Sequence, residues 1–97
     1  EEIIKVVGVD GLFIGPLDLS GSMGITGQLD HRDMVNALEK YKIIAKKSNK
    51  SFGMHIIRPN QQNIRNTIKQ GYTMIALGLD NVFLDEMSKN IINQAKR

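Results

Sequence analysis

The chain reads Gly-Val-Asp-Gly-Leu-Phe-Ile-Gly-Pro-Leu-Asp from residue 8 to residue 18. A short apolar run, Leu12 to Ile14, stands between glycines in this stretch, which predicts a buried β-strand that ends at Gly15. Asp18 follows shortly after and therefore belongs at the carboxyl end of the strand. In parallel α/β folds this end of the sheet holds the functional site, so Asp18 is the first candidate site residue.

Two further apolar runs, at residues 52–57 and 73–77, have the same character. Each is short, is bounded by Gly, Pro, Ser or Asn, and does not alternate cleanly between polar and apolar residues. Strands that are covered on both faces have this pattern, which is typical of a parallel sheet.

Helical patterns separate the predicted strands. Residues 33–49 carry an apolar stripe, and we expect Asp30 to cap this helix. Asn60 is the expected cap of the second helix and Gly71 its stop. A third helix follows Asp80, which we expect to cap it. This alternation implies an α/β fold of parallel strands joined by right-handed crossovers.

A weak internal repeat extends this prediction. Glycines enclose stretches of equal length from Gly8 to Gly15 and from Gly71 to Gly78; each stretch contains a predicted strand, and an aspartate follows shortly after each. Repetition of one βα unit favours a (β/α) barrel over a doubly wound sheet, although every parallel α/β chain shares part of this rhythm. A closed barrel needs eight strands and about 250 residues. This chain has 97 residues and supplies three βα units, so we expect an incomplete barrel with an open apolar face. Another segment or self-association would cover that face.

Composition narrows the classes of function. The chain has 13 Lys and Arg residues, 10 Asp and Glu residues, a formal charge of +3 and no Cys. Without cysteine there are no disulfides, no thiolate chemistry and no Cys-based zinc sites. The cations are spread along the chain and aromatic residues are few, so we expect no nucleic-acid partner. No apolar run suits a membrane span and no secretory leader opens the chain, so we expect a cytoplasmic protein without a membrane partner. Residues 1–8 read as the end of a helix, from which we expect further sequence upstream.

The chemistry of the first stretch lies between Gly15 and Asp18. Gly15 lets the backbone approach a ligand closely, and Pro16 stiffens the exit from the strand. The Asp18 carboxylate is a hard oxygen ligand of the kind that Mg²⁺ and Mn²⁺ prefer. Asp18 could instead cap a helical turn over residues 19–23, and the local pattern alone leaves both interpretations open.

Extended to Gly24, the stretch GVDGLFIGPLDLSGSMG resembles the HpcH/HpaI aldolase family, the metal-dependent class II pyruvate aldolases. The family pattern is VDG, three apolar residues, GP-x-DLS-x-x-x-G, and the chain matches it without a gap. The resemblance covers nearly the whole chain and continues at Gly27, His31, Gly53, Gly71 and residues 76–80. It implies that residues 1–97 are the C-terminal segment of an aldolase, with three βα units that form strands six to eight of a (β/α)₈ TIM barrel.

The resemblance implies a carbon–carbon lyase that reversibly cleaves 2-oxo-3-deoxy sugar acids or 4-hydroxy-2-oxo acids to pyruvate and an aldehyde. A divalent cation, Mg²⁺ or Mn²⁺ with Co²⁺ as a further candidate, would chelate pyruvate and stabilise its enolate as a Lewis acid. Asp18 matches a metal-ligating carboxylate of the family. Leu17 matches the residue whose backbone amide contacts the substrate carboxylate, and Gly15 belongs to the turn that presents this amide. The implied substrate-binding residues are therefore Gly15, Leu17 and Asp18.

The resemblance assigns the other functional residues to parts outside this segment. A second metal ligand, a Glu, belongs to the preceding strand, and the general-base His and the substrate-binding Arg belong to earlier strands. We therefore expect no catalytic residue in this segment and no aldolase activity from the segment alone. His55 either contacts the aldehyde half of the substrate at the pocket mouth or is only packed and hydrogen-bonded. Barrels of the family associate, so we expect a homo-oligomer, in which three residues contact a neighbouring subunit or pack within their own barrel: Met87, Ile91 and Ile92.

Other functions stay open at this point. A second enzyme hypothesis is a citryl- or malyl-CoA lyase-like member of the wider pyruvate-binding barrel superfamily. A third, non-enzymatic hypothesis is a half-barrel that assembles through its open sheet face. Ser20 and Ser22 lie near glycines, but the G-x-S-x-G nucleophile elbow is absent. Residues 21–27 are rich in glycine, lack the lysine of a P-loop, and are expected to form a flexible rim loop.

Overall fold

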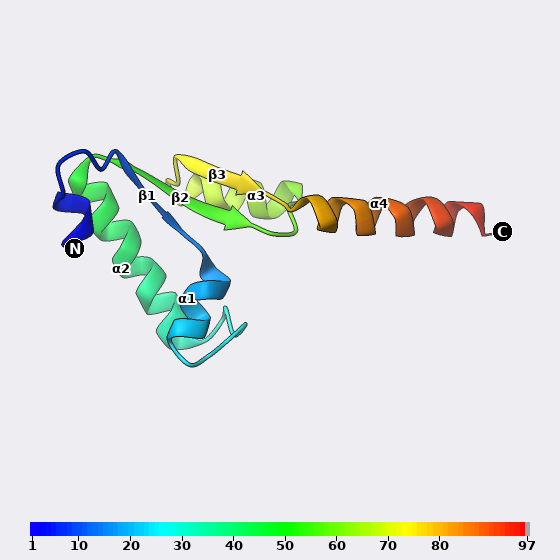
Figure 1. The fold of residues 1–97 in the computed structure, drawn as a ribbon, viewed down its shortest axis with the longest axis horizontal. Helices are drawn as coiled ribbons and strands as arrows, with labels where there is room; N and C mark the ends of the chain where they lie inside the picture. Colours follow the sequence, from blue (N-terminus) through cyan, green and yellow to red (C-terminus); the bar gives the residue numbers. More distant parts are fainter. Residues whose placement is uncertain (97) are drawn as a thin grey trace.

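Strands and helices alternate along the chain, as Figure 1 shows. The computed structural model describes residues 1–96. Its elements are, in chain order, the 3₁₀ helix η1 (Ile3–Lys5), β1 (Gly11–Ile14), α1 (Pro16–Ser22), α2 (Arg32–Ser48), β2 (Ser51–Ile56), α3 (Gln61–Lys69), β3 (Met74–Leu77) and α4 (Asp80–Ala95).

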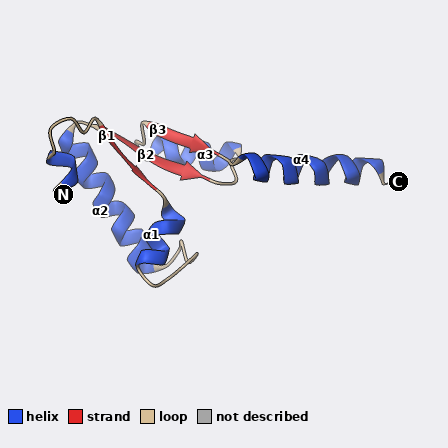
Figure 2. Cartoon of the chain, in the orientation of Figure 1, coloured by secondary structure: helices blue, strands red, loops and turns tan. Residues whose placement is uncertain are grey.

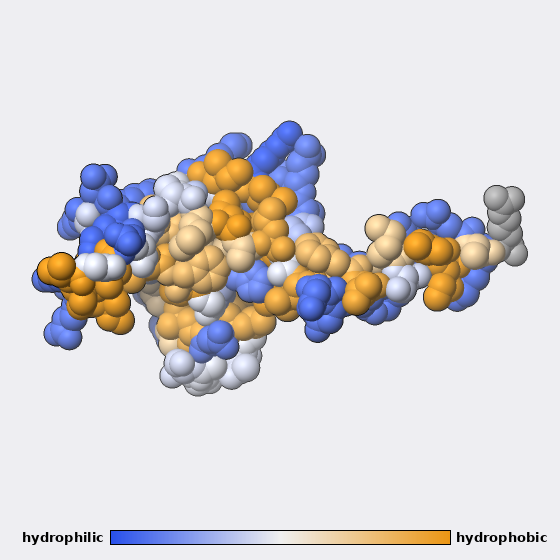
Figure 3. Space-filling view, turned by 45° about the horizontal axis from the view of Figure 1, so that its top comes forward, coloured by the Kyte–Doolittle hydropathy of each residue, from blue (hydrophilic) through white to orange (hydrophobic). Residues whose placement is uncertain are grey.

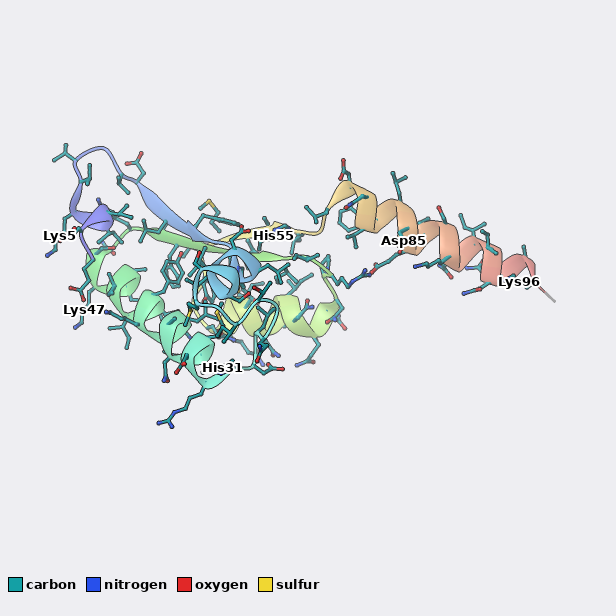
Figure 4. All side chains as sticks on the ribbon, turned by 60° about the horizontal axis from the view of Figure 1, so that its bottom comes forward. Lys5, His31, Lys47, His55, Asp85 and Lys96 are labelled. Carbon is teal, nitrogen blue, oxygen red and sulfur yellow. The ribbon has the colours of Figure 1, made fainter. Side chains whose placement is uncertain are left out.

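The strands form one parallel sheet in the order β1-β2-β3 (Figure 2). Gly53 in β2 pairs with Phe13 in β1 and with Met74 in β3. The helices α2 and α3 lie on the same side of this sheet (Figure 4), as right-handed connections between parallel strands require. The prediction of an α/β fold with three parallel βα units is therefore confirmed.

Helix α2 begins at a different cap from the one expected. His31, not Asp30, is its N-cap, because the Nδ1 atom of His31 accepts a hydrogen bond from the Asp33 N–H at 3.2 Å. His31 has an extended backbone (φ −61°, ψ 138°) directly before the first helical residue, which brings its ring within reach of that amide. Asp30 lies one residue further out, so the predicted cap is wrong.

Helix α3 begins and ends as predicted. The Asn60 side chain accepts a hydrogen bond from the Asn63 amide at 2.9 Å, and the Asn63 side chain accepts one from the Asn60 amide at 2.8 Å. This reciprocal capping box satisfies two helix-end donors. Gly71 follows the helix with a φ of +93°, in the left-handed region that glycine enters without steric cost. Gly8 has the same φ after η1, where the expected helix end is a single 3₁₀ turn.

One cluster of apolar side chains holds α2 and η1 to the sheet. Ile4, Ala45, Phe52 and Tyr72 are all buried in it. The ring of Tyr41 packs edge-on against Phe52, with 6.1 Å between the ring centroids. Edge-to-face packing of this kind adds to the stabilisation from burial of the rings. The core therefore lies between α2 and one face of the sheet.

The Tyr41 hydroxyl connects α2 to the junction of β1 and β2. It accepts a hydrogen bond from the Gly53 N–H at 3.1 Å and lies 3.0 Å from the carbonyl oxygens of both Leu12 and Gly53, to which it can donate. Burial raises the pKa of the Tyr41 hydroxyl, and the hydrogen bond to the Gly53 backbone opposes this rise. The hydroxyl thus fixes α2 relative to the strands.

The opposite face of the sheet is open. Phe13 and Met74 meet there over Gly53, because a Cβ at Gly53 would lie 2.5 Å from Cδ2 of Phe13 and 3.1 Å from Cε of Met74. The two side chains are 47% and 43% exposed. Figure 3 shows apolar residues gathered over the middle of the molecule and again along α4. The expectation of an open apolar sheet face is confirmed.

Helix α4 extends away from the sheet as an arm (Figure 1), and none of its residues is buried. Two contacts connect its first half to the rest of the chain. Glu86 forms an ion pair with Arg58, and the Phe83 ring lies against Gly78. Large apolar side chains are exposed along the arm, namely Phe83, Leu84, Met87, Ile91 and Ile92. None of the helices within residues 1–96 has the length and apolar character that a membrane crossing needs.

Candidate functional site

Helix α1 begins directly at the carboxyl end of β1. Gly15 is its N-cap, with φ −99° and ψ 103°, and Pro16 is its first residue. Proline suits this position because its missing N–H would have no partner there and its fixed φ matches a helix. Asp18 lies in the first turn of α1, at the edge of the sheet where the sequence placed it. Its role as a metal ligand stays a prediction.

The Asp18 carboxylate lies back over Gly15. A Cβ at Gly15 would lie 3.0 Å from Oδ2 of Asp18, so a larger residue at this position would press on the carboxylate. Asp18 is exposed, and within residues 1–96 its carboxylate forms neither a hydrogen bond nor an ion pair. Asp18 is therefore part of a helical turn, as one interpretation of the sequence held, but it does not cap that turn. Its oxygens are free to bind a ligand.

The backbone amide of Leu17 lies one residue before Asp18, in the first turn of α1. The first hydrogen bond of α1 runs from the Leu19 N–H to the Gly15 carbonyl at 2.9 Å. The amides of Leu17 and Asp18 precede it and have no partner inside the helix, as in the first turn of any helix. The Leu17 side chain is partly exposed, at 43%. An N–H donor and a carboxylate thus stand one residue apart at the rim of the sheet.

Ser20 connects this turn to the segment that follows α1. Its side chain is fully buried, and its hydroxyl donates a hydrogen bond to the Leu17 carbonyl at 2.6 Å. The same hydroxyl accepts a hydrogen bond from the Gly27 N–H at 2.9 Å. The Ser20 carbonyl also accepts one from the Ile25 N–H at 2.9 Å. Ser20 is therefore structural and not a nucleophile, and its role was not visible in the sequence.

The flexible rim loop expected at residues 21–27 is wrong in part. Gly21 and Ser22 belong to α1, and only the residues after them form a connection to α2. Ser20 fixes that connection by accepting two hydrogen bonds, from the backbone amides of Ile25 and Gly27. Helix α1 could form across this glycine-rich stretch because these contacts hold its last turn in place, which overrides the low helix propensity of glycine.

His55 has a hydrogen-bond partner on the neighbouring strand. Its Nε2 atom lies 2.8 Å from the Gly78 carbonyl oxygen, directly after β3. A carbonyl oxygen only accepts, so Nε2 donates this hydrogen bond. The Gly78 N–H in turn donates to the Ile56 carbonyl at 2.8 Å. The interpretation of His55 as a hydrogen-bonded strand residue is confirmed, and contact with a substrate stays a prediction.

Asp80 occupies the corresponding place after β3 but does not cap α4. Leu79 is the N-cap of α4, and its side chain makes no capping hydrogen bond. The Oδ1 atom of Asp80 accepts a hydrogen bond from the Asn81 N–H at 2.7 Å. The predicted cap is wrong, because Asp80 is already the first helical residue. Asp18 and Asp80 therefore differ, since only the Asp80 carboxylate is engaged by a backbone amide.

The described residues offer one suitable ligand for a divalent cation. Asp18 offers an exposed carboxylate without a partner, which is the oxygen donor that Mg²⁺ and Mn²⁺ bind. No group of three or more His, Cys, Asp or Glu side chains within residues 1–96 could hold a metal ion by itself. A cation held at Asp18 by three or more such side chains would therefore need ligands from outside these residues.

Comparison with known families identifies relatives of the chain. Residues 1–85 match the family model described as HpcH/HpaI aldolase/citrate lyase. The 4-hydroxy-2-oxo-heptane-1,7-dioate aldolase of Escherichia coli is 36% identical over 83 residues, which are 86% of this chain and 31% of that relative. The 5-keto-4-deoxy-D-glucarate aldolase of Klebsiella pneumoniae is 35% identical over 80 residues, which are 82% of this chain and 30% of that relative.

Solved structures agree with these relatives. An HpcH/HpaI aldolase/citrate lyase family protein from Burkholderia cenocepacia superposes with a TM-score of 0.89 at 25% sequence identity. The superposition covers 98% of this chain and 36% of that protein. The chain thus spans about a third of the length of the relatives it matches.

Proposed function

The chain belongs to the HpcH/HpaI aldolase/citrate lyase family, and on that premise we propose that residues 1–97 are the C-terminal part of a (β/α)₈ aldolase barrel. In this proposal β1, β2 and β3 are strands six to eight. The full-length barrel consists of these residues together with five preceding βα units. The open face on which Phe13 and Met74 are exposed supports the proposal, because inward-facing side chains fill the interior of such a barrel.

We propose that the full-length barrel reversibly cleaves a 4-hydroxy-2-oxo acid or a 2-oxo-3-deoxy sugar acid to pyruvate and an aldehyde. The names of the Escherichia coli and Klebsiella pneumoniae relatives, both aldolases, support this reaction class. In the cleavage direction the bond between C3 and C4 breaks. The C4 hydroxyl loses its proton, and its oxygen becomes the aldehyde oxygen. The electron pair of the broken bond stays with C3, which takes up a proton to become the methyl group of pyruvate.

The turn from Gly15 to Asp18 carries this chain's share of the chemistry. Asp18 contributes one oxygen ligand to a divalent cation, Mg²⁺ or Mn²⁺ with Co²⁺ as a further candidate. A cation bound there would supply Lewis-acid polarisation of the 2-oxo group. The Leu17 N–H donates a hydrogen bond to the substrate carboxylate and so orients it. This hydrogen bond is charge-assisted, because the acceptor is an anion. Gly15 leaves room for the Asp18 carboxylate to lie back over the strand end.

The segment by itself is proposed to be inactive. A single carboxylate with water ligands holds a divalent cation weakly, and no set of three candidate ligands lies together within residues 1–96. The residues that move protons during aldol cleavage would come from the preceding strands. We therefore assign no catalytic residue to this chain.

We also propose that the full-length barrel is a homo-oligomer. Five large apolar side chains of α4 are between 49% and 71% exposed, namely Phe83, Leu84, Met87, Ile91 and Ile92. An exposed apolar stripe of this length is a typical association surface. Met87, Ile91 and Ile92 lie on it and would contact a neighbouring subunit.

Exchange of the pyruvate methyl protons tests the proposed function. The full-length barrel should exchange these protons for deuterium in the presence of Mg²⁺, as followed by proton NMR. Asp18→Ala should abolish the exchange, whereas Asp80→Ala, which changes the corresponding carboxylate after β3, should retain it. Undiminished exchange by Asp18→Ala would overturn the assignment. Turnover of CoA thioesters only would replace the aldolase assignment by that of a citryl- or malyl-CoA lyase.

A further inference from the structure

We propose that Ser20 is a positioning residue, whose buried hydroxyl holds the turn that carries Asp18 against the segment between α1 and α2. This inference rests on the proposed function, because it concerns the carboxylate assigned there to the cation. Ser20 does not touch the cation or the substrate in this account. Its hydroxyl acts through the backbone of Leu17 and Gly27.

Asp18 needs such support because nothing holds its carboxylate directly. Within residues 1–96 the carboxylate forms no hydrogen bond or ion pair, and its Oδ2 atom lies 3.0 Å from the point where a Cβ of Gly15 would stand. Its position is therefore set by the backbone of α1. That helix has only seven residues, and so short a helix is not stable by its own hydrogen bonds. Side-chain hydrogen bonds and contacts with the segment that follows the helix therefore have to fix its first turn.

The Ser20 hydroxyl supplies the contact on the helix side. It donates to the Leu17 carbonyl at 2.6 Å. This carbonyl belongs to the peptide group whose N–H is that of Asp18, so the hydrogen bond restrains the plane that sets the direction of the Asp18 side chain.

The contact on the loop side comes from Gly27. Gly24 and Gly27 have φ angles of +73° and +76°, so two left-handed glycines turn the chain back toward α1. The returning Gly27 N–H donates to the Ser20 hydroxyl at 2.9 Å. Because Ser20 is fully buried, water cannot readily replace this bond. The hydroxyl therefore couples the path of the loop to the direction of the Asp18 carboxylate.

Two variants on α1 show whether the effect comes from the Ser20 hydroxyl or from removal of any serine of this helix. Ser20→Ala deletes the hydroxyl and leaves both backbone partners without it. Ser22→Ala is the matched control, since Ser22 lies on the same helix and is exposed. Loss of a residue that orients a metal ligand typically weakens metal affinity about ten- to hundredfold. We expect this loss for Ser20→Ala and a change within about twofold for Ser22→Ala.

The experiment uses the full-length barrel and Mn²⁺ as the probe. Binding of Mn²⁺ is titrated by electron paramagnetic resonance, and amide hydrogen exchange at Gly27 is measured in the wild type with and without Mn²⁺. We expect weaker binding by Ser20→Ala and slower exchange at Gly27 when Mn²⁺ is bound. The second measurement needs no variant, so it decides the question even if Ser20→Ala does not fold.

Two results would overturn the role of Ser20: unchanged Mn²⁺ affinity of Ser20→Ala, or Gly27 exchange that is indifferent to Mn²⁺. Asp18→Ala distinguishes this failure from a failure of the proposed function. If Asp18→Ala loses Mn²⁺ binding while Ser20→Ala keeps it, only the positioning role fails. If Asp18→Ala keeps Mn²⁺ binding, the ligand assignment fails and the role of Ser20 fails with it.

Discussion

The Asp18 carboxylate lies over the α-carbon of Gly15, with Oδ2 at 3.0 Å from the point where a Cβ of residue 15 would stand. Gly15 is not required there by its backbone conformation, because φ −99° and ψ 103° are accessible to any residue. A side chain at residue 15 would instead press on the Asp18 carboxylate, which would have to move by a few tenths of an ångström. The glycine therefore lets the carboxylate keep its place over the end of the strand.

Gly15→Ala should weaken cation binding without unfolding the protein. The added methyl group would push the Asp18 carboxylate away, and displacement of a ligand should weaken Mn²⁺ binding by about tenfold or more in the full-length barrel. Gly21→Ala is a matched control, because its new Cβ would meet only the Thr26 Oγ1 atom at 3.8 Å, an ordinary contact. Mn²⁺ titration by electron paramagnetic resonance measures both. Equal affinity in the wild type and Gly15→Ala would contradict the steric argument.

Tyr41→Phe should destabilise the fold. The hydroxyl of Tyr41 contacts the Gly53 N–H and the carbonyls of Leu12 and Gly53 at 3.0 to 3.1 Å. Removing it takes a hydrogen-bond partner from three partly buried backbone groups, which costs about 1–3 kcal/mol. Denaturant unfolding of the full-length barrel measures the change in free energy. A loss well below this range would mean that water or the neighbouring strand replaces the hydroxyl.

Tyr72→Phe should have the opposite outcome, although Tyr72 is also buried. Its hydroxyl has no hydrogen-bond partner among the described residues. Its deletion removes a polar group whose burial is not compensated, so the free energy of unfolding should stay constant or rise by up to about 1 kcal/mol. The same denaturant experiment compares the two variants directly. A destabilisation equal to that of Tyr41→Phe would show that the Tyr72 hydroxyl has a bound water or another partner.

The stability of the protein should fall between pH 10 and pH 12. Burial raises the pKa of Tyr72 from 10.0 to about 12, with smaller contributions from the charges of Tyr41 and Glu39. A raised pKa in the folded state means that the folded state holds the proton more tightly. This contribution is complete below the unfolded pKa and is lost as the pH rises through the folded pKa.

Unfolding followed from pH 9 to pH 12 checks this dependence, with the phenolate absorbance as the titration signal. Tyr72→Phe should lose less stability over this range than the wild type does. An identical alkaline loss in both proteins would show that Tyr72 does not titrate with folding.

A charge on the apolar stripe of α4 should weaken self-association. Ile91 is 57% exposed on this stripe, and Ile91→Asp would place a carboxylate in the proposed subunit contact, where it would lack a partner. Asn93→Asp adds the same charge on the opposite side of the helix and should leave the assembly unchanged. Sedimentation velocity of the full-length barrel measures both. A wild-type protein that is monomeric at all concentrations would contradict the oligomer proposal.

The strands and two of the helix ends could be predicted because local chemistry determines them. The apolar run from Leu12 to Ile14 ends at a Gly-Pro pair, and Asn60 and Gly71 have the cap chemistry that helix ends require. Helix α1 could be predicted only in part: a helical turn over residues 19–23 was one of two interpretations that the local pattern left open, and Gly21 and two serines read as a loop. Contacts with a returning segment stabilise it, and such contacts are not encoded by local pattern.

The candidate site was predictable to a similar extent. The place of Asp18 could be predicted because Asp18 follows the end of a strand, and the Gly-Pro pair marks that end clearly in the sequence. The function of Ser20 depends on the path of the chain to Gly27, and that of Tyr41 depends on how α2 crosses the sheet. Neither path can be derived from residue spacing, because both hydrogen bonds join elements that the sequence alone does not orient.

Mn²⁺ binding by a barrel assembled from two chains tests the central claim most directly. Residues 1–97 are co-expressed with the five preceding βα units as a separate chain, and Mn²⁺ is titrated into the purified complex and into each chain alone by electron paramagnetic resonance. We predict tight binding by the complex, weak binding by either chain, and loss of binding when the complex carries Asp18→Ala. Binding by residues 1–97 alone as tight as by the complex, or full binding by the complex with Asp18→Ala, would contradict the account.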